Sequence, residues 1–388
     1  MNRTNNQSNT DRDHLDESNQ DRSDTIDDLL RLSMIEGVGP IMRKKLLERF
    51  GSVASILSAP LAELRHVQGI GPKTAQAIAN ARNEIDVSAE LAACSKAGFN
   101  LIGERDERYP KLLREIPDPP GLLFVHGDLR HEDSLAIAIV GTRHATQYGL
   151  RQAERLATGL ARAGITIVSG LARGIDTAAH QAALAANGRT VAVLGSGLLN
   201  LYPPENAGLA AEIATQGAVI SESPCHTPPL SGLFPQRNRV ITGLSLGVIV
   251  VEAPLRSGAL VSAQHAMEQG REVFAVPGRV DNRTSRGCHR LIRDGAKLVE
   301  SVEDILEELG PLANATPSRD GRLLRNPAEL QLNVQEQAVL TVIQDSPTSI
   351  DEVVQRSGLP VNRVLATISV LEMRKLVRRI SGNFVARA

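Results

Sequence analysis

The sequence predicts an α/β protein with a doubly wound parallel sheet, an N-terminal helical domain and a C-terminal winged-helix domain. Short, continuous apolar runs alternate with helical patterns through the middle of the chain, as is typical of parallel strands covered on both faces. Before these runs a short glycine–proline motif, followed by a helical pattern, occurs twice. After them, three helical segments precede a hairpin pattern. The 388 residues are therefore expected to form several domains.

Composition excludes several classes of protein. No run of about 18 apolar residues can span a membrane and no signal-peptide segment is visible, so we expect a cytoplasmic protein without membrane association. The three cysteines, Cys94, Cys225 and Cys288, are too few and too far apart for a disulfide framework. His226 and His289 follow two of them, but adjacent residues rarely ligate one metal, so no metal site is expected.

The chain divides by composition into five segments. Residues 1–28 hold eight acids and three arginines with few apolar residues, and we expect this tail to be disordered. The repeated motif, the apolar runs, a polar linker and the final helical segments follow in that order. The expected boundaries are a tail over 1–25, a helical domain over 26–97, a sheet domain over 98–310, a linker over 311–332 and a winged-helix domain over 333–388.

The helical domain contains GVGP at 37–40 and GIGP at 69–72, each followed by a helical pattern with proline near its start. The two copies resemble paired helix-hairpin-helix motifs, whose glycine turns offer backbone N–H groups to a DNA phosphate. A helical interaction domain that keeps the turns for packing alone is the alternative, and both interpretations stay open. The residues concerned are Gly37, Gly39, Gly69 and Gly71, with Lys44, Lys45 and Lys73 nearby in the sequence.

The sheet domain contains six strand-like runs, AIAIVG, ITIVSG, TVAVLG, AVISE, GVIVVEA and VFAVPG, separated by helical patterns such as 148–164, 175–188 and 257–270. The proline-punctuated segment 98–129 is expected to lie against this sheet. The turn after the first run has one glycine where a dinucleotide fold has G-x-G-x-x-G, and no Walker-type motif occurs. No nucleotide cofactor is therefore expected.

Glycines, hydroxyls and arginines follow the strand-like runs. In a parallel sheet these positions meet at one edge, where helix N-termini form anion sites. Residues 135–300 carry fifteen arginines and one lysine against eleven acids, which favours a chain of phosphates over a single nucleotide. The expected contacts are Gly141, Thr142, Arg143, Ser169, Gly170, Arg173, Gly174, Gly195, Ser196, Gly197, Ser257 and Gly258.

Two further arginines, Arg237 and Arg239, precede an apolar helical pattern. A helix start favours acids, so this placement works against the helix dipole. It indicates either a ligand or a structural salt bridge with Glu222 or Glu252, and the residues alone leave both open.

Six linked segments carry a resemblance: IVGTR, SGLARGIDTAAHQAAL, LGSGL with YPPEN, FPQRNRVITGLS, VVEAPLRSGALVSAQHA and VFAVPGR. In this order they resemble the DNA-processing protein A (DprA/Smf) family over about residues 98–300. The resemblance implies an extended Rossmann-like domain that binds single-stranded DNA, protects incoming DNA and loads the RecA recombinase in natural transformation. It also implies a homodimer through that domain and no established catalysis. It makes Arg143 the leading phosphate ligand and adds Gly232, Phe234, Gln236, Arg237, Asn238 and Arg239 to the expected DNA-binding residues.

The chain departs from the pattern of that family at three positions. His226 and His289 stand where the family usually has glycine and asparagine, and Pro204 stands where some members carry lysine. We therefore expect the loop around Cys225 to differ from the family and one phosphate contact to be missing.

The last domain has a winged-helix outline, with a hairpin around Gly382 and Asn383. Basic residues follow its third helical segment, but that segment is rich in Val, Leu and Ile and offers few base-reading side chains. A partner-binding or auxiliary role is favoured, and a double-strand DNA regulator is the alternative. The basic residues are Arg374, Lys375, Arg378 and Arg379.

An enzymatic alternative rests on Asp176 and His180, which lie one helical turn apart near Ser169. Such a pair can act as a general base in a nucleotide-processing enzyme. The helix dipole explains the position of the carboxylate equally well, and core packing explains that of the histidine. In addition, the sequence lacks the Gly-Gly-x-Gly-Thr loop of related hydrolases. Catalysis is therefore not expected.

Overall fold

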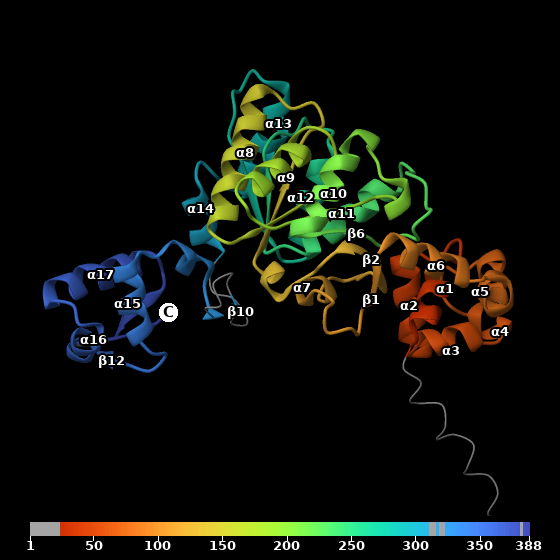
Figure 1. The fold of residues 1–388 in the computed structure, drawn as a ribbon, viewed down its shortest axis with the longest axis horizontal. Helices are drawn as coiled ribbons and strands as arrows, with labels where there is room; N and C mark the ends of the chain where they lie inside the picture. Colours follow the sequence, from red (N-terminus) through yellow and green to blue (C-terminus); the bar gives the residue numbers. More distant parts are fainter. Residues whose placement is uncertain (1–23, 310–315, 318–322, 381–382) are drawn as a thin grey trace, which may run out of the picture. The chain divides into compact units, whose positions relative to one another are not determined.

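The computed structural model describes residues 24–309, 316–317, 323–380 and 383–388 (Figure 1). The chain separates into two compact units, residues 1–91 and 92–388. Nearly all of the expected acidic tail lies outside the described residues. The division into five segments remains a prediction.

The first unit is helical, as the repeated motif predicts. Pro40 and Pro72 occupy the first positions of α2 and α5, where the missing N–H removes no intrahelical hydrogen bond. Gly37 and Gly69 precede those helices with φ of +89° and +95°, a backbone conformation that favours glycine. The helices are α1 (Ile26–Ser33), α2 (Pro40–Phe50), α3 (Val53–Ser58), α4 (Leu61–Leu64), α5 (Pro72–Glu84) and α6 (Ser88–Ala97), the last of which continues into the second unit.

The second unit is built on a nine-stranded sheet of order β1-β2-β6-β5-β4-β3-β7-β8-β9. The six apolar runs form the parallel strands β3 to β8, which confirms the predicted doubly wound sheet. Part of the segment 98–129 joins the sheet as two antiparallel strands beyond β6. The strands are β1 (Asn100–Gly103), β2 (Leu122–Gly127), β3 (Ala136–Val140), β4 (Thr166–Ser169), β5 (Thr190–Val193), β6 (Ala218–Ser221), β7 (Gly247–Val250), β8 (Glu272–Ala275) and β9 (Lys297–Leu298).

Helices cover both faces of this sheet (Figure 1). Along β3, Ala136, Ala138 and Val140 pack with residues of α11 and α12. Ile137 and Ile139 pack on the other face with α8 and α9, as the period of two in a strand requires. The helices are α7 (Lys111–Arg114), α8 (Gln147–Arg162), α9 (Ile175–Ala185), α10 (Ala207–Gln216), α11 (Leu233–Gly243), α12 (Gly258–Glu268), α13 (Arg286–Arg293) and α14 (Val302–Glu308).

The C-terminal part has the predicted winged-helix outline. Three helices precede a hairpin, and the strand order is β12-β14-β13. The turn is predicted around Gly382 and Asn383, of which Gly382 lies outside the described residues. The elements are β10 (Thr316–Pro317), β11 (Leu323–Leu324), α15 (Val334–Val342), β12 (Thr348–Ser349), α16 (Ile350–Ser357), α17 (Val361–Met373), β13 (Val377–Ile380) and β14 (Phe384–Arg387). Among the described helices, none is long and apolar enough to cross a membrane.

Candidate functional site

A small pocket lies where the loops after β3, β4 and β5 meet the first turn of α11. The carboxyl ends of these parallel strands share one edge of the sheet, so residues far apart in the sequence gather there. The structure brings five of the predicted residues together in this pocket and adds three others. The lining residues are Arg143, Gly170, Ala172, Arg173, Tyr202, Pro203, Phe234 and Arg237.

Two aromatic rings lie between two arginines along the pocket. The guanidinium carbon of Arg143 lies 5.4 Å from the centre of the Phe234 ring, and that of Arg173 lies 5.7 Å from the Tyr202 ring. The two ring centres are 5.8 Å apart. We call Arg143, Phe234, Tyr202 and Arg173 the arginine–aromatic row. Cations can bind phosphates and rings can stack on bases, so the row offers both contacts that a nucleic acid strand needs.

Arg143 and Arg173 differ in their partners. Both are exposed, but no described carboxylate pairs with Arg143, whereas Arg173 forms an ion pair with Glu205. The Arg143 charge is therefore open to an external anion, as the sequence predicts for its leading phosphate ligand.

Arg237 lines the pocket and is buried. It and Arg239 lie within α11, not before the helix as the sequence predicts. Arg237 donates a hydrogen bond to the Val193 carbonyl oxygen, and its Nε has no partner among the described residues. A Cβ on Gly170 would lie 2.2 Å from Nη1 of Arg237, so the bare glycine makes room for this guanidinium. Burial lowers the pKa of Arg237 to about 10, against the opposing charge of Asp176. The side chain is still protonated at neutral pH and adds positive potential at the pocket.

Arg239 has a structural role. It is buried and forms ion pairs with Glu222 and, at 3.2 Å, with Asp118. Burial raises the pKa of Glu222, and the charge of Arg239 opposes that shift. Of the two interpretations of this arginine, the structure therefore shows the salt bridge with Glu222. Direct contact between Arg239 and DNA stays a prediction that its burial does not support.

The pair behind the enzymatic alternative is buried and engaged. Asp176 accepts hydrogen bonds from the N–H groups of Gly170 and Ala172, at 3.1 and 3.3 Å. Nδ1 of His180 lies 2.7 Å from the hydroxyl oxygen of Thr190, and burial lowers the pKa of His180 to about 3. A neutral, fully buried imidazole is not placed to take a proton from a substrate at the surface.

Glu252, which the sequence analysis named only as a possible partner for an arginine, fills the N-terminus of α8. Its carboxylate accepts hydrogen bonds from the N–H of Thr146 at 2.9 Å and from the hydroxyl of Thr146 at 2.7 Å. A Cβ on Gly149 would lie 2.4 Å from this carboxylate. The helix N-terminus that receives a nucleotide phosphate in dinucleotide folds is therefore occupied by the chain itself.

Most of the predicted glycines serve close packing between loops. A Cβ on Gly195 would lie 2.8 Å from the Phe234 ring, and one on Gly174 would lie 2.5 Å from the carbonyl oxygen of Thr142. A Cβ on Gly141 would lie similarly close to the side chain of Ile175, and one on Gly197 would lie similarly close to the backbone of Cys225. Among the predicted glycines of the sheet domain, only Gly232 and Gly258 have open space at this position. The packing accounts for the other glycines, and their role as phosphate ligands stays a prediction.

The predicted polar side chains around the pocket are mostly turned inward. The hydroxyl of Ser169 donates to the carbonyl oxygen of Ile139 at 2.6 Å. Ser196 and Thr142 are buried, and Ser257 caps α12. Gln236 and Asn238 donate to Glu222 and to the carbonyl oxygen of Gly258, at 3.4 and 3.2 Å. These contacts shape the loops, and direct DNA contact by these side chains remains untested.

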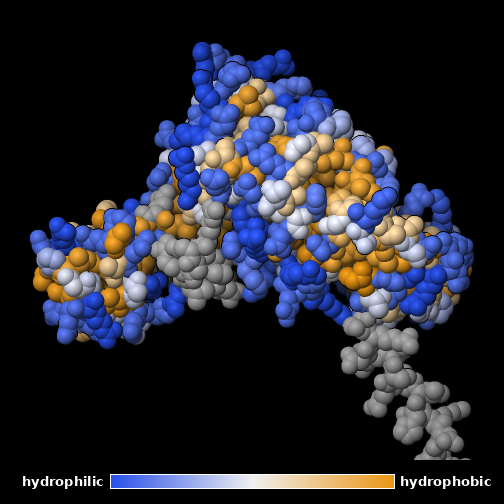
Figure 2. Space-filling model, in the orientation of Figure 1, coloured by the Kyte–Doolittle hydropathy of each residue, from blue (hydrophilic) through white to orange (hydrophobic). Residues whose placement is uncertain are grey.

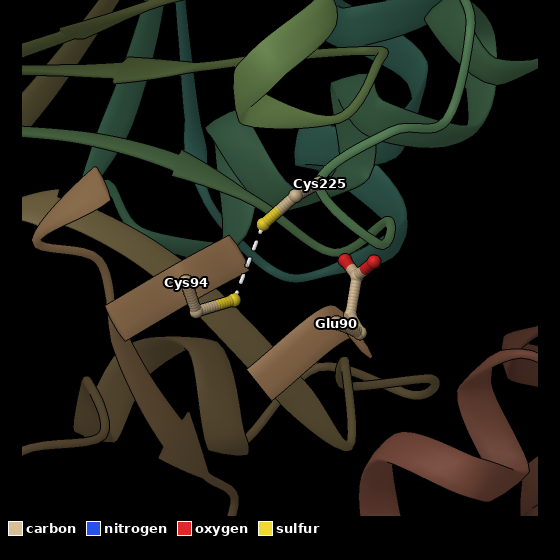
Figure 3. A group of neighbouring side chains, drawn as sticks. All are labelled: Glu90, Cys94 and Cys225. Atoms are coloured by element: carbon tan, nitrogen blue, oxygen red, sulfur yellow. Dashed lines mark hydrogen bonds between the residues drawn. The ribbon is translucent and has the colours of Figure 1, made fainter. Parts of the chain in front are cut away.

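The two cysteines that precede histidines have different neighbours. Sγ of Cys94 lies 3.2 Å from Sγ of Cys225, and Figure 3 shows the two sulfur atoms facing one another. Cys288 lies instead against the carbonyl oxygen of Val250 at 3.4 Å. Cys225 and Cys288 are therefore held by different neighbours.

In the first unit the two glycine turns pack against each other's helices. A Cβ on Gly37 would lie 3.0 Å from the hydroxyl oxygen of Thr74 in α5, and one on Gly69 would lie 3.2 Å from Met42 in α2. Gly39 and Gly71 face open space. Packing explains the first glycine of each turn, and DNA binding by the second remains open.

Two of the four predicted basic residues of the winged-helix part form ion pairs. Arg374 forms an ion pair with Glu336 at 3.2 Å, and Arg379 forms one with Glu372 at 3.2 Å. Figure 2 shows hydrophobic residues among hydrophilic ones at the surface of this part. Val361, Met373 and Phe384 are exposed there, at 53%, 75% and 44%. Exposed apolar residues are consistent with the predicted partner-binding role.

Tyr202, which lines the pocket, and Glu205, which pairs with Arg173, were not among the predicted site residues. Both lie in the segment YPPEN, which contributed to the family resemblance but was given no contact. A tyrosine at a strand end in a chain with only three tyrosines was the available signal.

Comparisons with known proteins cover nearly all of the described chain. Residues 100–310 match the family model for DNA recombination-mediator protein A, residues 325–383 match the DprA winged helix domain, and residues 29–84 match the SAM-like helix-hairpin-helix tandem. Protein Smf of Synechocystis sp. is 35% identical over 385 residues, which cover 91% of this chain and 96% of the relative. Protein Smf of Escherichia coli is 42% identical over 300 residues, covering 77% and 80%. The solved structure of DNA processing protein A from Streptococcus pneumoniae is 40% identical, with a TM-score of 0.63 over 72% of this chain and 95% of that chain.

Proposed function

The chain belongs to the DNA recombination-mediator protein A family, and on that premise we propose that it binds single-stranded DNA at the arginine–aromatic row. The observation that carries the proposal is Arg143, an exposed guanidinium without a described carboxylate partner, stacked 5.4 Å from the Phe234 ring. A single strand exposes both phosphates and base faces, whereas a duplex hides its base faces in the stack. The name of the pneumococcal relative, a DNA processing protein, supports DNA as the ligand.

The test compares labelled single-stranded and double-stranded oligonucleotides of one sequence by fluorescence anisotropy at several salt concentrations. We expect tighter binding of the single strand, with log K falling by about 0.7 per log unit of salt for each phosphate contact. Tighter binding of the duplex would favour the regulator alternative. Release of base or phosphate from nucleotides by the purified protein would favour the enzymatic one.

We also propose a homodimer through the sheet domain. The strand β9 is the outer strand of the sheet, and an exposed edge can pair with another chain. Beside it lies a largely apolar depression of about 550 Å³, in which Val280 is 84% and Leu298 is 40% exposed. Apolar surface next to an open sheet edge favours a self-complementary contact.

Analytical ultracentrifugation of the full chain tests this proposal. Leu298→Glu and Val280→Glu are expected to shift the protein towards the monomer. Met373→Glu introduces the same charge at an exposed apolar residue of the winged-helix part and is expected to leave the mass unchanged. A monomeric wild type, or a dimer in both sheet-domain variants, would contradict the proposal.

Loading of the RecA recombinase, with protection of incoming DNA in natural transformation, is the further proposed role. The description of the family as a recombination mediator supports it. The test measures RecA-dependent ATP hydrolysis on single-stranded DNA that is coated with single-strand-binding protein. Addition of this protein should shorten the lag, and an unchanged lag would contradict the role.

A further inference from the structure

The rim of the pocket holds an ion pair that lies where a DNA phosphate is expected. Arg173, from the loop before α9, donates to the carboxylate of Glu205, and the two side chains are 44% and 49% exposed. Nη1 of Arg173 also lies 3.4 Å from the hydroxyl oxygen of Tyr202. Asn206 donates to the carbonyl oxygen of Leu171 at 2.8 Å, which fixes the segment of Glu205 against the loop of Arg173.

We propose that Tyr202 and Arg173 form a second nucleotide subsite beside Phe234 and Arg143. In this subsite Glu205 stays paired with Arg173 until a DNA phosphate replaces the Glu205 carboxylate. The inference rests on the proposed binding of single-stranded DNA at this pocket. It assigns a base-stacking role to Tyr202 and a competing role to Glu205.

The rings support two neighbouring base positions. Tyr202 and Phe234 lie with their centres 5.8 Å apart and their planes tilted by 57°. Each has its own arginine, at 5.7 and 5.4 Å, so each ring is paired with a positive charge for the phosphate of the same nucleotide. Stacking of this kind accepts any base, because every base has a π face.

The carboxylate of Glu205 takes the position at Arg173 that we assign to a DNA phosphate. A carboxylate and a phosphate both present acceptor oxygens to the planar guanidinium fork. The hydrogen bond from Arg173 lowers the pKa of Glu205, so the carboxylate is charged at neutral pH. An ion pair that is this exposed is weak, so an incoming phosphate can take its place. Arg143 can thus bind a phosphate at once, whereas Arg173 can bind one only when the phosphate replaces the carboxylate of Glu205.

The first test is Glu205→Gln, which removes the charge and keeps the shape of the side chain. We expect single-stranded DNA to bind about two- to fivefold more tightly, as the loss of a weak competing ion pair implies. Glu212→Gln removes one charge from an exposed position of nearby α10 and is the matched control. In an Arg173→Ala background, Glu205→Gln should tighten binding no more than this control does.

The second test concerns Tyr202. Tyr202→Leu should weaken binding of single-stranded DNA by about 5- to 100-fold, the range expected when one stacked base loses its ring. Tyr202→Phe keeps the ring and should bind as the wild type does. Circular dichroism checks the fold, and if Tyr202→Leu fails to fold, the Glu205 variants decide.

The outcomes separate this inference from the proposed function. A wild-type protein that does not bind single-stranded DNA overturns the proposed function itself. A wild type that binds, together with Glu205→Gln no tighter than Glu212→Gln, overturns the competing role of Glu205. A folded Tyr202→Leu variant with wild-type affinity overturns the second subsite.

Discussion

The two basic regions of the second unit, the pocket of the sheet and the winged-helix part, differ in what their arginines face. In the pocket, Arg143 and Arg173 each lie within 6 Å of an aromatic ring centre, at 5.4 and 5.7 Å, although Arg173 also pairs with Glu205. In the winged-helix part, Arg374 and Arg379 face the carboxylates of Glu336 and Glu372. The number of arginines therefore does not locate a nucleic acid site. We expect the combination of charge with an accessible ring to locate it, because a strand offers phosphates and base faces together.

The sharpest way to break this comparison is to remove one arginine from each region. Arg143→Ala should cost about 1.5–3 kcal/mol of binding free energy for single-stranded DNA, the range for a hydrogen bond to a charged group. It should also flatten the dependence of log K on log salt by about 0.7. Arg378→Ala, at an exposed arginine of the winged-helix part, is the matched control and should leave the affinity within about twofold. Equal effects of the two variants, measured by anisotropy across salt, would remove the distinction.

The aromatic half of the comparison is tested with one phenylalanine from each region. Phe234→Leu should cost about 1–3 kcal/mol of binding free energy with an unchanged salt slope, because a stacked ring carries no charge. Phe384→Leu alters a half-exposed ring on the other domain and should have no effect on affinity. A changed salt slope in Phe234→Leu would show that the loop had lost its shape and would count against a pure stacking role.

The comparison extends to acid stability. Burial lowers the pKa of His180 to about 3, whereas residues 325–388 contain no histidine. Below pH 6.5, His180 binds a proton in the unfolded chain but stays neutral in the folded protein. The stabilisation of the folded state that comes from this group is therefore fully present above pH 6.5 and is lost as the pH falls. The sheet domain should lose about 1.4 kcal/mol of unfolding free energy for each pH unit from 6.5 towards 3 through this group.

Hydrogen exchange of amides in β3 to β5 at several pH values measures that loss in the full chain. His180→Asn keeps an acceptor and donor near the position of Nδ1 and should flatten the pH dependence, although it lowers stability overall. The same slope in wild type and variant would assign the acid sensitivity to other groups.

Much of the fold follows from the sequence because its strands are buried on both faces. A strand such as β3, whose residues are all buried, must be a continuous apolar run. The edge strands β1 and β9 were not predicted. β1 begins with an exposed polar residue, and β9 has only two residues, both of them exposed. Helices α2 and α5 were predicted by glycine and proline, which act locally.

The site was only partly predictable, because its decisive contacts join distant segments. The position of Arg143 at a strand end follows from the apolar run before it, while its contact with DNA stays a prediction. The pairing of Arg239 with Glu222 was one of two stated alternatives. Glu252 caps α8 from 106 residues away, and no local pattern indicates such a contact. The glycines are ambiguous in the sequence, since close packing between loops and bare contact with a phosphate both require a missing side chain.

The most direct test of the central claim, that the sheet pocket is the main DNA site, is fluorescence anisotropy with a chain truncated after residue 310. We expect this chain to bind single-stranded DNA within about tenfold of the full-length protein, and Arg143→Glu in the truncated chain to weaken binding by more than about tenfold. Circular dichroism confirms that each protein is folded. A folded truncated chain that loses more than about tenfold, or 1.4 kcal/mol, would contradict the claim and place the main site in the winged-helix part.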